Sequence, residues 1–488
     1  MKVLTAAAMR AVDQRTIELG IPGLVLMENA AHRVVEEMVQ FFGVLGGHRI
    51  TVLCGKGNNG GDGLAIARLL YVRHQPVNLT VVLSCEPGDL RGDALANFQM
   101  LGAAGVFIEH EIPAAAALST IVIDAVLGTG LIGAARGRAL AAIDSINNGF
   151  PLARVVAVDV PSGMASDGGA SEGAIARADL TVTFTAPKLC HVLPPNCNRL
   201  GKLVVAPIGS PQHLLQSDIA CCEASDFSTL FGARQRGAHK GTFGHVLLVG
   251  GATGKSGAVK MAGLAALRAG AGLVTVASES DELAPELMTL PLWDAPKTLE
   301  GKNVLAIGPG LGTSAEAARL IELLLETGAP VRVLDADALN LIAQTKWKAA
   351  GVAVLTPHPG EMARLLQCTV AQVETDRMSA VKRCAFERNA IVVLKGERSL
   401  IATPEGRVFI NPTGSPAMAK GGSGDILTGL LSGLLAQFPE QALLATCAAV
   451  YLHGLAGELG AAALGEKCLL ATDLLEFLPE AMRVVHPV

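Results

Sequence analysis

The sequence predicts an α/β protein made of two domains, each a parallel β-sheet covered by helices on both faces. Short aliphatic runs alternate with helix-length stretches, which is the pattern of repeated β-α units. This alternation stops once near the middle of the 488 residues and then restarts. Half of the residues are hydrophobic but only 3% are aromatic, so Ala, Val, Leu and Ile fill the cores, as in strands buried on both faces.

The first half begins with helices and continues with strands. Residues 1–40 carry apolar positions at helical spacing in MRAVDQRTIEL and LVLMENAAHRVVEEMVQFF. Six strand-like runs follow, RITVLCG, VNLTVVL, STIVIDAV, RVVAVDV, DLTVTF and KLVVAPI, with helices expected over 63–71 and 93–101. Successive β-α-β units close by right-handed crossovers, so we expect these strands to be parallel.

Residues 209–240 show no sustained period and predict a linker with the lead-in to a second domain. We therefore expect domains over 1–218 and 225–488. The second set of strands is HVLLVGG, GLVTVAS, NVLAIGPG, RVLDADA, AVLTPHPGE, AIVVLKG, SLIAT and VFINP. Long helices close the chain. The most apolar stretch, 442–465, contains His453 and Glu458 and predicts a buried helix rather than a membrane span.

Charge and cysteine usage exclude several classes of protein. The 39 basic and 44 acidic residues leave a net charge of -5, without the basic surplus that a phosphate backbone requires. The ten cysteines form no C-x-x-C pair, which argues against a zinc site. The first residues lack a signal-peptide core. We expect a cytoplasmic enzyme with reduced thiols and neither a nucleic-acid nor a membrane partner.

The segment ITVLCGKGNNGGDG, residues 50–63, leads from a strand into a helix that we expect to open at Asp62 or Gly63. Glycines and a helix N-terminus together favour a phosphate-bearing ligand. The three glycines of GKGNNG also satisfy the dinucleotide fingerprint, although the acid expected about 20 residues further on is met only loosely by Glu86. A structural turn without a ligand is the alternative.

Two later strands of this half end in carboxylates. Asp124 ends STIVID, and Asp159 ends RVVAVD and precedes Ser162. Ligands of α/β sheets bind beyond the carboxyl ends of strands, so these segments can meet in one crevice. Carboxylate, amide and hydroxyl oxygens suit a hard cation. Simple capping explains either aspartate alone.

The motifs MRAVDQRTIELGIPGLVLMENAA, GKGNNGGDGLAIAR, DAVLGTGL, VDVPSGM and TFTAPK resemble, in this order, the NAD(P)HX epimerase domain. That resemblance implies a Rossmann-like α/β/α domain that epimerises C6-hydrated nicotinamide dinucleotides and holds a potassium ion. The implied hydrate contacts are Asn58, Asn59, Gly60, Gly61, Asp62, Gly128, Thr129, Gly130, Leu131, Ile132, Gly133, Ala134 and Asp159. The implied potassium ligands are Asn59, Asp124 and Ser162. We choose Asp159 as the general acid/base, because epimerising a carbinolamine carbon requires proton transfer. For Lys188, a structural role and a phosphate-pairing role stay open.

The second half contains two glycine-rich loops. VGGATGKSG, residues 249–257, resembles a P-loop but is one residue short of the required spacing. In GGSGD, the glycines Gly421, Gly422 and Gly424 allow a tight turn into a helix that we expect to begin near Asp425. Amides at that helix start can hold a phosphoryl group, with the carboxylate beside it. A plain N-cap is the alternative for Asp425.

Together, GGSGD, GPGLG, LTPHPGE and LKGERS resemble the ribokinase-like ADP- or ATP-dependent NAD(P)H-hydrate dehydratase, an α/β/α fold. The implied contacts to the hydrate are Ala258, Gly310, Leu311, Gly312, His358 and Asp425. The implied nucleotide contacts are Lys395, Gly396, Glu397, Arg398, Ser399 and Gly424. The resemblance also implies Mg²⁺ and ADP, with ATP as an alternative, in a reaction that phosphorylates the C6 hydroxyl and then eliminates phosphate.

Both resemblances concern one damaged cofactor, and together they cover nearly the whole chain. They predict a bifunctional isomerase and lyase acting on NADHX and NADPHX, and we expect a homo-oligomer. One alternative is a small-molecule hydroxyl kinase of the ribokinase-like superfamily fused to a nucleotide-binding module. A non-enzymatic nucleotide sensor and a dehydrogenase using GKGNNG are further alternatives.

Overall fold

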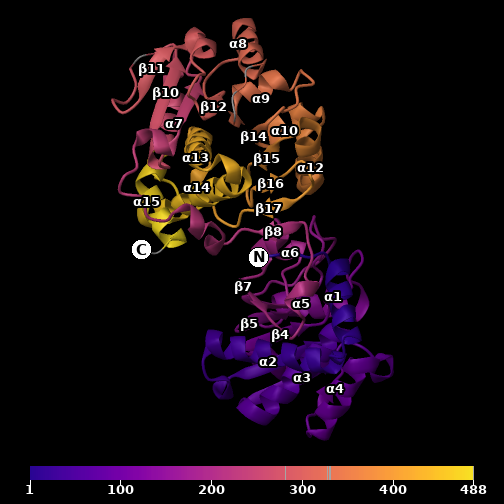
Figure 1. Cartoon of the computed structure of the whole chain (residues 1–488). Helices are drawn as coiled ribbons and strands as arrows, with labels where there is room; N and C mark the ends of the chain where they lie inside the picture. The colour runs from indigo at the N-terminus through magenta and orange to yellow at the C-terminus, as the bar shows by residue number, and fades with distance from the viewer. Residues whose placement is uncertain (281, 327, 329–330, 487–488) are drawn as a thin grey trace. The chain divides into compact units, whose positions relative to one another are not determined.

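The computed structural model describes residues 1–280, 282–326, 328 and 331–486. The chain divides into two compact units, Met1–Ser217 and Asp218–Val488, and both are α/β (Figure 1). The predicted fold class is therefore confirmed. The second unit takes in the residues from 218 onward because a short strand there joins its sheet.

The N-terminal unit contains a seven-stranded, wholly parallel sheet in the order β3-β2-β1-β4-β5-β6-β7. Its strands are β1 (Arg49–Cys54), β2 (Asn78–Leu83), β3 (Ile108–Glu109), β4 (Ile121–Ala125), β5 (Arg154–Val158), β6 (Leu180–Phe184) and β7 (Lys202–Ala206). Its helices are α1 (Ala6–Glu18), α2 (Gly23–Phe42), α3 (Asn58–Leu69), α4 (Gly92–Ala103), α5 (Gly137–Asn148) and α6 (Leu189–Val192).

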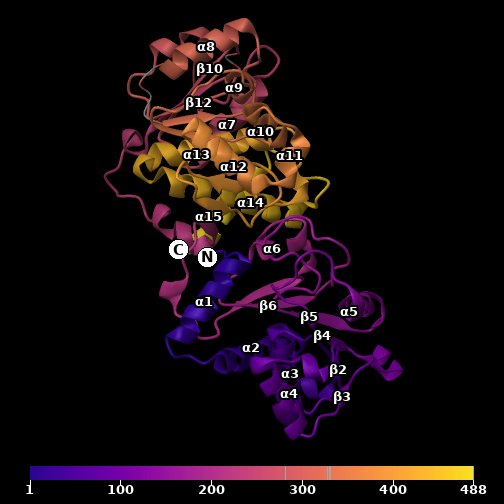
Figure 2. The ribbon, with the colours of Figure 1, turned by 90° about the vertical axis from the view of Figure 1, so that its right-hand side faces the viewer.

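Side chains alternate between two cores, one on each face of this sheet. Val52 and Ile123 pack with α2, α3 and α4, whereas Leu53 and Val122 pack with α5. Figure 2 shows α2, α3 and α4 together, with α5 apart from them and α1 along another flank of the unit. Helices on both faces explain why the strands read as continuous aliphatic runs.

Helix α3 begins at Asn58, so the expected start at Asp62 or Gly63 is wrong. The residues NNGGD form its first turns, with Gly57 as the N-cap. A β-carbon at Gly60 would overlap the carbonyl oxygen of Gly55, and one at Gly61 would lie 2.8 Å from Sδ of Met27. These glycines serve close packing, whereas helix propensity alone places Gly-Gly outside a helix.

The C-terminal unit contains a ten-stranded sheet in the order β11-β10-β9-β12-β13-β14-β15-β16-β17-β8. Only β16 runs antiparallel to its neighbours among these described strands. The strands are β8 (Ile219–Cys221), β9 (His245–Val249), β10 (Leu273–Ser278), β11 (Met288–Pro291), β12 (Val304–Ile307), β13 (Val331–Leu334), β14 (Val352–Leu355), β15 (Ile391–Leu394), β16 (Leu400–Ala402) and β17 (Val408–Ile410). The helices are α7 (Ser256–Arg268), α8 (Ala315–Glu326), α9 (Asp337–Ile342), α10 (Pro359–Leu366), α11 (Val370–Thr375), α12 (Arg377–Arg388), α13 (Ser423–Gln437), α14 (Ala442–Leu464) and α15 (Leu474–Val485).

Strands β3, β8 and β11 are absent from the expected set because two to four residues are too few to display a period. Strand β8 lies inside the predicted linker and pairs in parallel with β17. Its edge position leaves it without the long aliphatic run that marks the central strands. Pairing with a distant strand, rather than local pattern, therefore makes this segment a strand.

Helices α7 and α13 approach very closely in the C-terminal unit. A β-carbon at Gly429 or Gly433 would overlap a carbonyl oxygen of α7. Helix α13 begins at Ser423, two residues before Asp425, after Gly422 with φ +96°. Among the described residues, one helix, extending over Pro439–Leu464, is long and apolar enough to cross a membrane. Most of that stretch is buried, and α14 packs in the core with α13 and α15.

Candidate active sites

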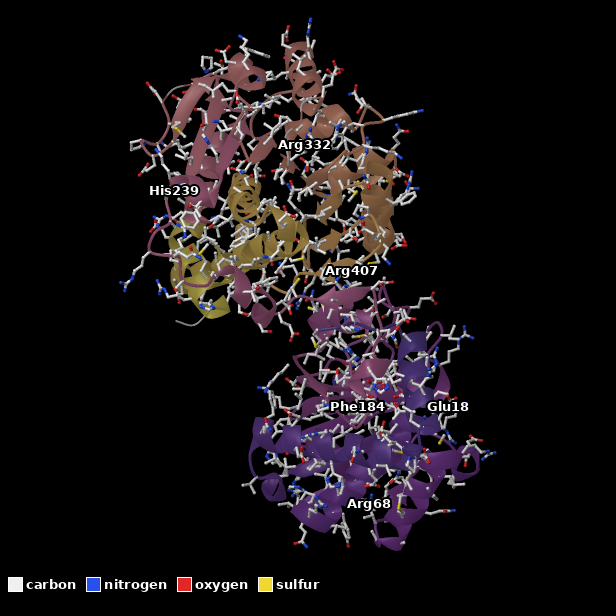
Figure 3. All side chains as sticks on the ribbon, viewed as in Figure 1. Glu18, Arg68, Phe184, His239, Arg332 and Arg407 are labelled. Atoms are coloured by element: carbon white, nitrogen blue, oxygen red, sulfur yellow. The ribbon has the colours of Figure 1, made fainter. Side chains whose placement is uncertain are left out.

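The strand order of the N-terminal unit reverses between β1 and β4, and the segments that follow β1, β4 and β5 line a cavity of about 540 Å³. Such a switch point is where open α/β sheets bind ligands. Phe184, labelled in Figure 3, lies at the end of β6 and lines the same cavity. The expected hydrate contacts that line it are Asn58, Asn59, Asp62, Gly128, Thr129, Gly130, Leu131, Ile132 and Asp159. Gly60, Gly61, Gly133 and Ala134 lie outside this lining.

Asp159 follows β5 with a left-handed backbone, φ +63°. Its Oδ1 accepts hydrogen bonds from Nζ of Lys188 at 2.5 Å and from Oγ1 of Thr183 at 2.8 Å. Lys188 is 1% exposed, and it also donates to Thr183. Burial alone would raise the pKa of Asp159, but the charge and hydrogen bond of Lys188 hold that pKa below its ordinary value. A carboxylate is therefore kept ionised at the cavity wall.

Asp124, Ser162 and Asn59 surround the start of the loop after β4. Ser162 donates to Asp124 through both its amide, at 2.8 Å, and its hydroxyl, at 2.5 Å. Burial raises the pKa of Asp124 to about 6, against these hydrogen bonds. Both polar atoms of the Asn59 side chain are buried and have no partner among the described residues. A β-carbon at Gly128 would lie 3.2 Å from Cβ of Asn59, so the two loops touch.

Two further carboxyl groups, Asp13 and Asp62, line the cavity. Burial raises the pKa of Asp13 to about 6, and burial with the charges of Asp159 and Asp13 raises the pKa of Asp62 well above its ordinary value. Asp62 is among the expected contacts, but Asp13 is not. The sequence carries a signal for it: Met9, Asp13 and Ile17 are spaced by four and share one face of α1.

In the C-terminal unit the strand order reverses between β9 and β12, and the loops after these strands bind each other. The amides of Gly251 and Ala252 donate to the carbonyls of Pro309 and Gly310 at 2.9 and 2.8 Å. A β-carbon at Gly310 would lie 3.3 Å from that of Ala258. Those amides of the P-loop-like segment are therefore engaged with protein rather than directed at a phosphate.

The loops after β13 and β15 meet at the start of α13. Nζ of Lys395 lies 2.8 Å from Oδ1 of Asp335, whose Oδ2 accepts from Thr428 of α13 at 2.8 Å. A β-carbon at Gly424 would lie 3.5 Å from Nζ of Lys395. Burial, reinforced by the charge of Asp335, raises the pKa of Asp425 to about 6. The Asp425 carboxyl, the Lys395 ammonium group and the first amides of α13 therefore lie close together.

His358 is the N-cap of α10, and its side chain is half exposed. Its Nδ1 accepts from the amide of Gly360 at 3.0 Å, and its own amide donates to Glu361 at 2.8 Å. Burial raises the pKa of Glu361 to about 7, and its Oε2 lies 3.9 Å from Nζ of Lys395. His358 is therefore held next to Glu361, which contacts Lys395.

Two family models match the chain: "YjeF-related protein N-terminus" over residues 23–190 and "NAD(P)H-hydrate dehydratase" over residues 246–480. The bifunctional NAD(P)H-hydrate repair enzyme of Moorella thermoacetica is 42% identical, over 99% of this chain and 97% of that protein. The enzyme of the same name from Coxiella burnetii is 37% identical, over 96% and 97%. The chain belongs to the bifunctional NAD(P)H-hydrate repair enzyme family.

A solved structure resembles the C-terminal unit of this family member. The ADP/ATP-dependent NAD(P)H-hydrate dehydratase from Bacillus subtilis, co-crystallised with ATP/Mg²⁺, is 32% identical with a TM-score of 0.51. The match covers 55% of this chain and 99% of that one. The ribokinase-like fold expected for the second half is confirmed.

In this repair-enzyme chain the expected nucleotide contacts, Lys395–Ser399, follow β15 in sequence. Arg377 donates to the carbonyl of Glu397 at 2.6 Å, and Arg398 donates to that of Pro412 at 3.0 Å. Nε and Nη2 of Arg377 are buried without a partner among the described residues. Arg377, Asp335 and Glu361 are absent from the predicted set. The HPGE motif contained Glu361, whereas no local pattern marks Arg377 or Asp335.

Proposed function

We propose that the N-terminal unit epimerises the R and S hydrates of NADH and NADPH, and that the C-terminal unit dehydrates the S hydrate with ADP, releasing AMP and phosphate. The observation that carries the proposal is the position of the two motif sets. Each motif set lies beyond the carboxyl ends of the strands of its own sheet. Each also contains an aspartate of shifted pKa, Asp159 in the first and Asp425 in the second. Similarity to the curated repair enzymes over nearly the whole chain supports the same assignment.

In the N-terminal cavity, Asp159 is the acid/base group. Epimerisation at C6 requires the hydroxyl to leave with a proton and water to add again while losing one. Lys188 keeps Asp159 ionised, so this carboxylate acts as the base that takes a proton from the water adding to C6. The walls of the roughly 540 Å³ cavity hold the nicotinamide end of the dinucleotide, with the start of α3 near its phosphates.

Potassium fits the residues beside this cavity. The side-chain oxygen of Asn59 is buried and has no partner within the part of the chain that the structure describes. The carboxylate of Asp124, at the end of β4, accepts from the hydroxyl of Ser162 in the loop after β5. Oxygen donors of this kind suit a hard cation. Asn59, Asp124 and Ser162 would hold the ion, which would supply positive charge near the bound hydrate.

In the C-terminal unit, Asp425 is positioned to take the proton of the C6 hydroxyl as a phosphoryl group arrives from ADP. Amides at the start of α13 stabilise the developing charge, and Lys395 adds a cation beside Gly424. The phosphorylated oxygen is then a good leaving group, so elimination restores the dihydronicotinamide. Magnesium needs only one or two carboxylates besides the phosphates. Asp337, whose charge affects the pKa of Asp425, would supply one, and the ion would neutralise phosphate charge.

The test is incubation of the full chain with mixed R and S hydrates and ADP, followed by the ultraviolet absorbance of the restored dihydronicotinamide. Complete recovery supports both activities. Recovery of the S fraction alone removes the epimerase proposal, and accumulation of a stable phosphate ester favours a hydroxyl kinase. Replacing ADP by ATP tests which nucleotide is used. The cytoplasmic location and the homo-oligomeric state stay predictions.

A further inference from the structure

Helix α1 is attached to the loop that carries Lys188. The amide of Leu4 donates to the carbonyl of Pro187 at 3.0 Å, and Leu4 forms a β-bridge with Lys188. Met9 of α1 packs in one small core with Leu4 and Ala186. The same loop therefore fixes both the Lys188–Asp159 pair and the position of α1.

Asp13 projects from α1 to the cavity wall, one helical turn after Met9. Its Oδ1 is buried and has no hydrogen-bond partner among the described residues. A carboxyl oxygen left unpaired in this way is costly unless a ligand or water completes it. The charged groups that line the cavity with it are Arg10, Lys56, Asp62, Asp93, Asp159 and Lys188.

Resting on the proposed epimerase function, we propose that Asp13 is a second catalytic residue, which exchanges a proton with the C6 hydroxyl on the face of the ring opposite to Asp159. Inversion at C6 by loss and re-addition of water needs a proton donor on one face and an acceptor on the other. Asp13 comes from α1, whereas Asp159 follows β5, so two different walls of one cavity supply the two groups.

The step balances without any oxidant or reductant. Asp13, as a carboxylic acid, protonates the C6 hydroxyl; the C6–O bond breaks, water leaves with the bonding electrons, and the ring nitrogen lone pair forms C=N⁺. Water then adds to C6 from the other face, the C=N⁺ electrons return to nitrogen, and Asp159 takes the released proton. Inversion of the opposite epimer runs the same steps backwards, and exchange with solvent resets the pair.

The surroundings of Asp13 and Asp159 shift their pKa values in opposite directions. Burial raises the pKa of Asp13 to about 6, while Lys188 overcomes burial to hold the pKa of Asp159 below its ordinary value. One proton on the pair is therefore carried by Asp13. A pair of carboxyls with divergent pKa values is the usual arrangement for one acid and one base.

The test uses the full chain. Epimerisation of purified S hydrate is followed by chromatography without ADP, and ADP-driven dehydration is measured separately on the same protein preparation. Asp13→Asn is expected to lower epimerisation by roughly 10²–10⁴-fold and to leave dehydration unchanged. Glu18→Gln removes a charge from the same helix at an exposed position and is the matched control. Near-normal epimerisation by a folded Asp13→Asn protein overturns the proposal.

The unmodified protein provides a second measurement. Because Asp13 must be protonated, the epimerisation rate is expected to fall as pH rises through about 6, and this limb is absent from the residual rate of Asp13→Asn. A rate that is constant from about pH 5 to about pH 9 overturns the proposal even if the variant does not fold. A wild-type chain without epimerisation contradicts the proposed function instead, so the two failures are distinguishable.

Discussion

Nζ of Lys188 lies 2.5 Å from Oδ1 of Asp159, and this pair joins the end of β5 to the loop after β6 at the wall of the N-terminal cavity. Lys188 is almost wholly buried, whereas the Asp159 side chain is 16% exposed to the cavity. The ammonium group thus fixes a carboxylate that a ligand can reach. This geometry favours a role through Asp159 over the phosphate-pairing role left open for Lys188.

Replacing Lys188 by Met leaves Asp159 beside an apolar side chain. Removing one partner of a buried pair is expected to destabilise the fold by roughly 3–5 kcal/mol. In the wild type, the lowered pKa of Asp159 contributes stability that is present near neutral pH and is lost as pH falls through that pKa. Without Lys188, burial raises the pKa of Asp159, so this contribution disappears. The double variant Lys188→Met/Asp159→Asn should be more stable than Lys188→Met alone. Denaturant unfolding of the three proteins measures this coupling, and additive changes would contradict it.

Asp159→Ala should abolish epimerisation and leave dehydration of pure S hydrate intact, because the two sites lie in separate compact units. Asp144→Ala, at an exposed position on α5, is the control for loss of one carboxylate in the same unit. The measurement is the rate of each reaction with a single epimer as substrate. A parallel fall of both rates in folded Asp159→Ala would be evidence against separate sites.

Potassium should raise the thermal stability of the chain more than sodium does. The physical reason is that both polar atoms of the Asn59 side chain are buried without a partner among the described residues. Asn59 packs against Gly128, in the loop whose Leu127 amide donates to Ser162. Unfolding temperatures measured in matched KCl and NaCl solutions test this expectation. Asn59→Ala should remove the difference between the two salts. If wild-type and Asn59→Ala proteins respond alike, the ion does not bind here.

Asp425→Asn should keep ADP binding but lower dehydration by at least roughly 10²-fold, since an amide cannot accept the hydroxyl proton. In the wild type, the rate should rise with pH through about 6, where Asp425 ionises. Asp473→Asn, at the N-cap of α15, is the matched control for an aspartate at a helix start. Near-normal dehydration by Asp425→Asn would show that Asp425 has only a structural role at the start of α13.

Gly396→Ala should weaken ADP binding. Gly396 has φ +147°, and a β-carbon there would lie 2.9 Å from Nη2 of Arg377. Nη1 of the same guanidinium donates to the Glu397 carbonyl. Gly406→Ala is the control, because Gly406 also has positive φ, +92°, but its β-carbon would meet no atom within 4 Å. Calorimetric titration with ADP should separate them. Equal affinities would show that the loop tolerates the displaced guanidinium.

Much of the fold follows from the sequence, and several of the predicted site residues lie close to one another in the structure, although their roles stay predictions. Asn59 lies in the first turn of the helix after β1, Asp124 lies at the end of β4 and Ser162 follows β5. Ser162 binds Asp124, and Asn59 packs against the loop after β4, because such strand ends share one edge of a parallel sheet. In the second sheet, Gly310 of the loop after β12 meets Ala258 in the first turn of α7, the helix after the neighbouring strand β9. Aliphatic runs fixed where those strands lie, because strands buried on both faces leave a strong local pattern.

Other features depended on the tertiary structure. The partner of Lys188 is 29 residues away, that of Lys395 is 60 away, and Arg377 reaches a loop 20 away. Local pattern also misplaced the start of α3, where glycines pack against Gly55 and Met27. Sequence periodicity reports which face of an element is buried. The pairing of buried charges and the seating of α1, with Asp13, on the cavity are decided by how distant segments pack, because burial and charge proximity arise only there.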